Sequence, residues 1–276
     1  SPCSRCLLLA LSHDELGVIV DGLADPLQPV VAVALSSTCK GLRTPLRAAL
    51  EVLRQRHEKA KALGREAGTM NEKLIRVALS CADLSGAEEL NWRDSDLTAD
   101  DLATLGLILP WMPRLKKLVL YNNNFSNAGA QALFEGLGRG AAPSLRHLDL
   151  GNNNFGPEGA EAISAAFIRG AMPKLDELYL SQNRIGKRGI ASLAPALKRL
   201  PALNRLDLGT NEIGDEGVAS LLDNVGKDDF KALEELYLDD NMLTDTGCAT
   251  VLAALKAGAL PAIEALYHPD EADVIS

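Results

Sequence analysis

Hydrophobic and polar positions repeat in a fixed order through the second part of the chain. The stretch that begins at Leu115 reads L-K-K-L-V-L-Y-N-N-N-F, and four stretches with the same spacing of leucines and asparagine begin at Leu145, Leu175, Leu203 and Leu233. The starts lie 28 to 30 residues apart. A period of this length is typical of a solenoid, in which each unit buries its apolar side against the next unit.

Each unit divides into a strand and a helix. The leucines of one unit, for example Leu145, Leu148 and Leu150, are spaced to point to one side of a short strand. An asparagine follows each strand where the chain turns, and we expect its amide to bind backbone groups of its own turn and of the next one. These asparagines are Asn123, Asn153, Asn183, Asn211 and Asn241.

The second half of each unit has the pattern of a helix. Residues suited to N-capping are expected to open the helices: Ser126, Gly156, Gly186, Gly214 and Thr244. Three residues later each helix has a glycine, which indicates close packing of the helix start against a neighbour: Gly129, Gly159, Gly189, Gly217 and Gly247. Apolar residues at helical spacing, such as Ala219, Leu221 and Leu222, are expected to form the buried helix face.

Weaker units lie at both ends of the array. A first unit begins near Ala87, and Thr98 with Asp101 three residues later is expected to cap its helix. A seventh strand is expected near Ile263 and Leu266, before His268 and Pro269 break the pattern. We therefore predict six repeats and a truncated C-terminal cap over residues 85–276, preceded by a helical module over residues 1–84.

The repeat over residues of about 87–268 resembles the leucine-rich repeat of the ribonuclease-inhibitor type. The resemblance rests on the pattern L-x-x-L-x-L-x-x-N followed by a full helix. It implies an α/β leucine-rich-repeat solenoid, a horseshoe with parallel strands inside and helices outside. Residues 11–84 lack the repeat and have the apolar spacing of helices, which predicts a small all-helical N-terminal cap.

A segment before the repeats, residues 11–43, resembles an F-box. The matching positions are Leu11, Glu15, Leu16, Ile19, Leu23, Cys39 and Arg43. This resemblance implies binding to the adaptor of a cullin ubiquitin ligase. The alternative is that the segment only caps the first repeat, since solenoids expose apolar ends that need a cap.

Composition and charge narrow the class of partner. The chain has 276 residues and a formal charge of −9, which argues against nucleic acid as the main partner. No apolar run is long enough to span a bilayer, so no membrane insertion is expected.

Five scattered cysteines do not form the framework of a secreted domain, and an intracellular, reducing compartment fits them better. Cys3 and Cys6 form a C-x-x-C that could be half a zinc site or a redox pair, but no second pair completes it.

Polar and aromatic residues at the outward strand positions are the candidate binding site. The face begins acidic, is basic in the second and third repeats, and is then mostly acidic with tyrosines. Complementary charge and desolvated tyrosine suit a protein partner; the alternative is a solvated face that keeps the protein soluble. The candidates are Lys117, Arg146, Glu177, Tyr179, Arg205, Asp207, Glu235 and Tyr237. We interpret His147 as a rim contact of this face.

Motifs of catalysis or cofactor binding are absent from the sequence, so we expect neither an enzyme nor a cofactor. The favoured function is a non-catalytic protein-protein interaction scaffold, within a larger multiprotein complex or as a separate protein. One alternative is an F-box substrate receptor of a ubiquitin ligase. Another is a leucine-rich-repeat GTPase activator, for which Arg184 and Asn154 near the strand ends are the candidates.

Overall fold

The computed structural model describes residues 55, 58, 86–223, 225–226 and 229–267. The chain divides into two compact units, Ser1–Ser85 and Gly86–Ser276. In the first unit, Gln55 and Glu58 are helical. The F-box-like segment 11–43 and the C-x-x-C of Cys3 and Cys6 lie outside the described residues, and their proposed roles stay predictions.

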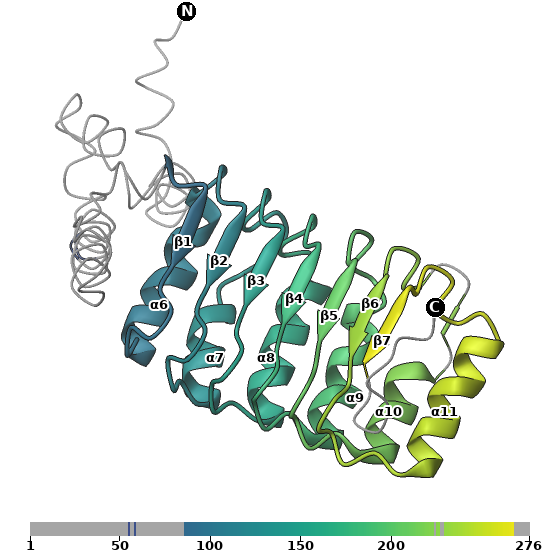
Figure 1. Ribbon diagram of the computed structural model, residues 1–276. Coiled ribbons are helices and arrows are strands. Elements are labelled where there is room, and N and C mark those ends of the chain that lie inside the picture. Colours follow the sequence, from purple (N-terminus) through teal and green to yellow (C-terminus); the bar gives the residue numbers. More distant parts are fainter. Residues whose placement is uncertain (1–54, 56–57, 59–85, 224, 227–228, 268–276) are drawn as a thin grey trace, which may run out of the picture. The chain divides into compact units, whose positions relative to one another are not determined.

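The second unit alternates short strands with helices (Figure 1). Its strands are β1 (Glu89–Asn91), β2 (Lys117–Val119), β3 (His147–Asp149), β4 (Glu177–Tyr179), β5 (Arg205–Asp207), β6 (Glu235–Tyr237) and β7 (Ala265–Tyr267). Its helices are α6 (Ala99–Ile108), α7 (Asn127–Phe134), α8 (Pro157–Ile168), α9 (Gly186–Leu197), α10 (Gly214–Leu222) and α11 (Asp245–Lys256), and the 3-10 turn η2 (Leu109–Trp111) follows α6.

The strands form one parallel sheet in the order of the chain, β1 to β7. Each strand residue pairs with the residue at the same position of the next repeat, as in Leu178 with Leu206. The helices line up in a second layer along one side of the sheet (Figure 1). The fold is therefore an α/β leucine-rich-repeat solenoid, as the sequence predicted.

The core lies between the sheet and the helix layer. The middle residue of each strand from β2 to β6 is a leucine with at most 1% of its surface exposed. Aromatic residues at equivalent positions also pack on each other: the rings of Phe125 and Phe155 stack with their centroids 6.0 Å apart. Identical positions in successive repeats thus pack on each other, which is how a solenoid buries leucines that a lone strand would expose.

The asparagines after the strands form a buried ladder of hydrogen bonds. Asn211 Nδ2 donates to the carbonyl oxygens of Leu208, in its own turn, and of Leu180, in the preceding repeat, at 3.0 and 2.8 Å. Its Oδ1 accepts from the amide of Ile185 at 3.3 Å. The sequence correctly predicted amides that satisfy turn backbone, but it placed the second partner in the next repeat. Each asparagine side chain therefore points toward the end of the strand in the preceding repeat.

The helix starts differ from the expected caps. Thr98 caps α6 with Asp101 as predicted, and Thr244 caps α11. Ser126 occupies the N-cap of α7, yet its side chain makes no capping hydrogen bond. Gly186 and Gly214 lie one position later than predicted, as the first residues of α9 and α10, with φ of 61° and 65°. This left-handed conformation favours glycine.

The glycines inside the first helical turns mark close contacts between repeats. A Cβ on Gly217 would lie 2.5 Å from Cγ2 of Ile213 and 2.9 Å from Cγ2 of Ile190. The expected close approach is therefore present. On α10 the predicted face residues Leu221 and Leu222 are buried, but Ala219 is exposed and Val218 takes its place in the core.

Candidate functional site: a polar cluster on the strand face

The strand face is the side of the sheet formed by the first and third residues of β1 to β7. In β3 to β6 these residues are partly exposed while the leucine between them is buried. The parallel register gives this face two rows that cross the strands. The first row contains Glu89, Lys117, His147, Glu177, Arg205, Glu235 and Ala265. The third row contains Asn91, Val119, Asp149, Tyr179, Asp207, Tyr237 and Tyr267.

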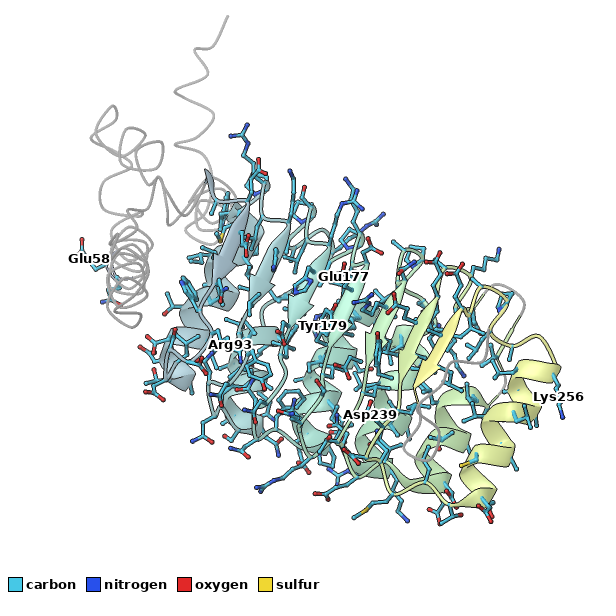
Figure 2. The ribbon with its side chains drawn as sticks, viewed as in Figure 1. Glu58, Arg93, Glu177, Tyr179, Asp239 and Lys256 are labelled. Carbon is cyan, nitrogen blue, oxygen red and sulfur yellow. The ribbon has the colours of Figure 1, made fainter. Side chains whose placement is uncertain are left out.

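Side chains of β4 and β5 are in contact on this face. Figure 2 labels the two residues that β4 contributes, Glu177 and Tyr179. The hydroxyl of Tyr179 donates to Oε2 of Glu177 at 3.0 Å, and Nη1 of Arg205 donates to that hydroxyl at 3.2 Å. On the other side of Glu177, Nδ1 of His147 lies 2.8 Å from Oε2. The rings of His147 and Tyr179 have centroids 5.0 Å apart. These contacts link β3, β4 and β5.

The same chain of contacts continues to β6. Nη2 of Arg205 lies 2.5 Å from Oε1 of Glu235, and the hydroxyl of Tyr237 donates to Oε2 of Glu235 at 2.8 Å. We call the connected residues the strand-face cluster. Its members are His147, Glu177, Tyr179, Arg205, Glu235 and Tyr237.

The contacts hold the charged members of the cluster in their ionised forms. Hydrogen bonds to Glu235 and Tyr179 raise the pKa of Arg205. Burial raises the pKa of Glu235, but the hydrogen bonds and charge supplied by Arg205 and Tyr237 outweigh burial, so this pKa lies below its ordinary value. The pKa of Glu177 is lowered in the same way, with burial outweighed by His147, Tyr179 and Arg205.

Two carboxylates of the third row have the opposite shift. Burial raises the pKa of Asp149 and of Asp207, although the backbone amides of Gly151 and Gly209 donate to them at 2.9 and 3.0 Å. Asp207, a predicted site residue, therefore lies beside the cluster on β5 without belonging to its chain of hydrogen bonds. Hydrogen bonds from Gly209 and Ser181 lower the pKa of Asp207, but burial outweighs them, so the pKa lies above its ordinary value.

The remaining two candidates lie toward the N-terminal end of the sheet. Lys117 begins β2 and pairs with Glu89 at 3.4 Å. Its neighbour Lys116 pairs with Glu88 at 2.8 Å. Arg146 is exposed and directly precedes β3. Lys117 is thus paired within the face rather than joined to the strand-face cluster.

His147 is the member of the cluster that sequence reasoning undervalued. It was placed on the face as a rim contact, yet only 22% of its side chain is exposed and it binds Glu177. The signal was the row of equivalent positions, where the basic residue types Lys117, His147 and Arg205 each lie beside a glutamate. Residues at equal positions of neighbouring repeats lie side by side in a parallel sheet, so opposite charges there can pair.

The two candidates for a GTPase activator lie in the turns that follow the strands. Arg184 and Asn154 are both exposed. Their backbone amides donate to the carbonyl oxygens of Phe155 and Phe125 in the preceding repeats. The side chain of Asn154 also donates to Asn124. Each residue thus takes part in the regular stacking of the turns.

Neither a metal-binding group nor a membrane-spanning helix is found in the part of the chain that the structure describes. Within it, no group of three or more His, Cys, Asp or Glu side chains is arranged to hold a metal ion. Nor does any helix among these residues combine the length and apolarity needed to cross a bilayer.

Comparison with known proteins identifies the repeat. A family model described as "Leucine Rich repeat" matches residues 141–164, 171–194 and 200–222. Each matched segment contains one strand, β3, β4 or β5, and most or all of the helix that follows it. No curated protein matches the sequence.

Several solved structures are similar to parts of the chain. Actin-Binding Site 2 of leiomodin-1 has 21% identity and a TM-score of 0.40, covering 55% of this chain and 78% of that one. The tropomodulin C-terminal domain of Caenorhabditis elegans has 15% identity and a TM-score of 0.39, covering 58% and 87%. TLR13, in a complex with ssRNA13, has 20% identity and a TM-score of 0.37, covering 69% and 23%.

Proposed function

We propose that this leucine-rich-repeat solenoid, of the ribonuclease-inhibitor type, is a non-catalytic scaffold that binds a protein partner on its strand face. The partner contacts the strand-face cluster and the carboxylates beside it. The scaffold acts within a larger assembly, because a repeat array offers a long surface to more than one neighbour.

The observation that carries this proposal is the continuous chain of contacts from His147 to Tyr237. It fixes two tyrosines and an arginine, the residue types that dominate binding energy at protein interfaces. Side chains that are already held in place lose less conformational entropy when a partner binds. A solvated face that only confers solubility would need no such ordering.

Affinity purification from cells that express the tagged chain tests the proposal, with partners identified by mass spectrometry. Replacing Tyr179 and Tyr237 together with alanine should reduce partner recovery by about tenfold or more, because each truncation removes a residue of the hot-spot type. The control is Ile168→Ala, since Ile168 lies on α8 in the helix layer and is 52% exposed. Unchanged recovery by a folded double variant, or equal loss in the control, would overturn the assignment of the strand face.

A second experiment distinguishes the ubiquitin-ligase alternative from the scaffold proposal. It compares the partners of the intact chain with those of a version lacking residues 1–45. The F-box resemblance predicts that only the intact chain recovers a cullin adaptor. If both versions recover the same proteins and no adaptor, the N-terminal segment is not an adaptor-binding module and the scaffold proposal remains. GTP hydrolysis by recovered GTPases, with and without the chain, tests the third possibility.

A further inference from the structure

Asp207 occupies a distinctive place on the strand face. In the sheet register it lies between Tyr179 of β4 and Tyr237 of β6. Neighbouring strands are about 4.8 Å apart, so the two tyrosine positions are separated by about 10 Å with the carboxylate between them. An aromatic position thus stands on each side of a partly buried negative charge.

Neighbouring negative charges disfavour the ionised form of Asp207, so a cation bound there would be stabilising. Burial is the main cause of its raised pKa, and the charges of Asp239 and Asp149 raise the pKa further. Arg205, which begins the same strand, already binds Glu235 and Tyr179. Lys117 is paired with Glu89. Arg205 and Lys117 are therefore bound to other partners, while the charges of Asp239 and Asp149 act on Asp207.

Gly209 brings one of these carboxylates close. A Cβ at position 209 would lie 2.8 Å from Oδ2 of Asp239, so the absence of a side chain admits Asp239 beside the turn that holds Asp207. The amide of Gly209 also donates to Oδ1 of Asp207. The backbone amide of Gly209 thus orients the carboxylate of Asp207, and the missing side chain of Gly209 leaves room for the carboxylate of Asp239.

We propose that Asp207, flanked by Tyr179 and Tyr237, receives an arginine side chain of the partner protein. The proposal rests on the proposed function, because it names the chemistry of a partner that binds this same face. Arginine fits better than lysine, since its planar guanidinium can form two hydrogen bonds to a carboxylate and stack on aromatic rings. A cation beside a tyrosine ring is also attracted by the π-electrons.

Calorimetric titration of the full chain with a hexa-arginine peptide tests this assignment, and a hexa-lysine peptide tests the choice of cation. Asp207→Asn keeps an oxygen that can accept from Gly209 and removes the charge. Asp240→Asn is the matched control, because Asp240 is exposed and its loss changes the net charge equally. Circular dichroism establishes that both variants fold.

The expected result is a loss of about tenfold in arginine-peptide affinity for Asp207→Asn and less than about twofold for Asp240→Asn. The lysine peptide should bind wild type several-fold more weakly than the arginine peptide. Equal losses in the two variants, or equal affinity for the two peptides, would overturn the arginine assignment.

Two further outcomes separate the alternatives. If the arginine titration fails while the double tyrosine variant still loses its partner, the scaffold proposal stands and only the partner chemistry is overturned. Failure of the tyrosine experiment with a positive titration overturns the proposed function instead.

Discussion

Nη2 of Arg205 lies 2.5 Å from Oε1 of Glu235, and the two residues are direct partners in the register of β5 and β6. About a third of the Arg205 side chain and a quarter of the Glu235 side chain are exposed. The pair is therefore intermediate between a surface ion pair, which contributes little, and a buried one, whose disruption is costly.

Replacing Arg205 with glutamine should lower the free energy of unfolding by about 1 kcal/mol at pH 7. The pKa of Glu235 is lowered in the fold, so the stabilisation is present above the unfolded pKa and is lost as pH falls through the folded pKa. Urea unfolding at pH 7 and near pH 3 measures this difference. Lys187→Gln, which breaks the exposed pair with Glu216, should have almost no effect; equal losses would mean that burial of the Arg205 pair is unimportant.

Asp207→Asn should stabilise the protein at neutral pH by less than about 1 kcal/mol, a small value because the carboxylate is partly exposed. The pKa of Asp207 is raised, so its ionisation opposes folding as pH rises through the raised pKa. The gain from asparagine should accordingly be present at pH 7 and absent well below the ordinary pKa of aspartate. Unfolding midpoints across pH check this, and a loss of stability at pH 7 would contradict it.

Leu206→Ala should cost roughly 2 to 5 kcal/mol, because it empties a fully buried position at the centre of the sheet. Chemical unfolding measures the cost. Leu252→Ala, on a helix position that is 43% exposed, is the control and should cost far less. Similar costs for the two variants would contradict the inward position of Leu206.

Gly217→Ala should destabilise by about 1 to 3 kcal/mol, because the new methyl group would collide with Ile213 and Ile190. Gly136→Ala is the matched control, since nothing lies within 4 Å of a Cβ at that position. The control should be neutral or slightly stabilising. A thermal unfolding series on both variants would reveal whether the repeats can separate enough to admit the methyl group.

Asn211→Ala should cost about 2 kcal/mol or more, because it leaves the carbonyl oxygens of Leu180, Leu208 and Gly209 without this donor. Asn183→Ala is expected to cost less, since Oδ1 of Asn183 has no hydrogen-bond partner. The two variants have the same change in size and charge, so their difference isolates the acceptor side of the amide. Equal unfolding free energies would contradict this account of the ladder.

The repeating residues made most of the fold predictable. Leu148, Leu178 and Leu206 recur at one position because each strand stacks on the next, so periodicity alone places them inside. The direction of the asparagine bonds was missed because spacing does not say whether a turn stacks forward or backward. The helix starts at Gly186 and Gly214 were missed by one residue because their left-handed φ is a property of the backbone and not of hydrophobic pattern.

The candidate site was predictable as a set of positions, and less so as a set of contacts. Glu177, Tyr179, Arg205, Glu235 and Tyr237 were all selected for their outward strand positions, and the register brings them together. Which of them bond depends on side-chain rotamers and on distances that a repeat pattern does not contain. Asp207 and Arg205 show the limit, because both belong to β5 and only Arg205 joins the chain of hydrogen bonds.

The asparagine ladder has a mechanical consequence. Asn153 bonds the turn of its own repeat and that of the preceding one, and Asn241 does the same near the other end. Among the described repeats, each of these asparagine side chains bonds only its own turn and the adjacent repeat, so a pulling force applied along the row of strands would load the interfaces between repeats in series. Under tension, such a stack yields at its weakest interface, and the repeats beyond the break keep their internal order.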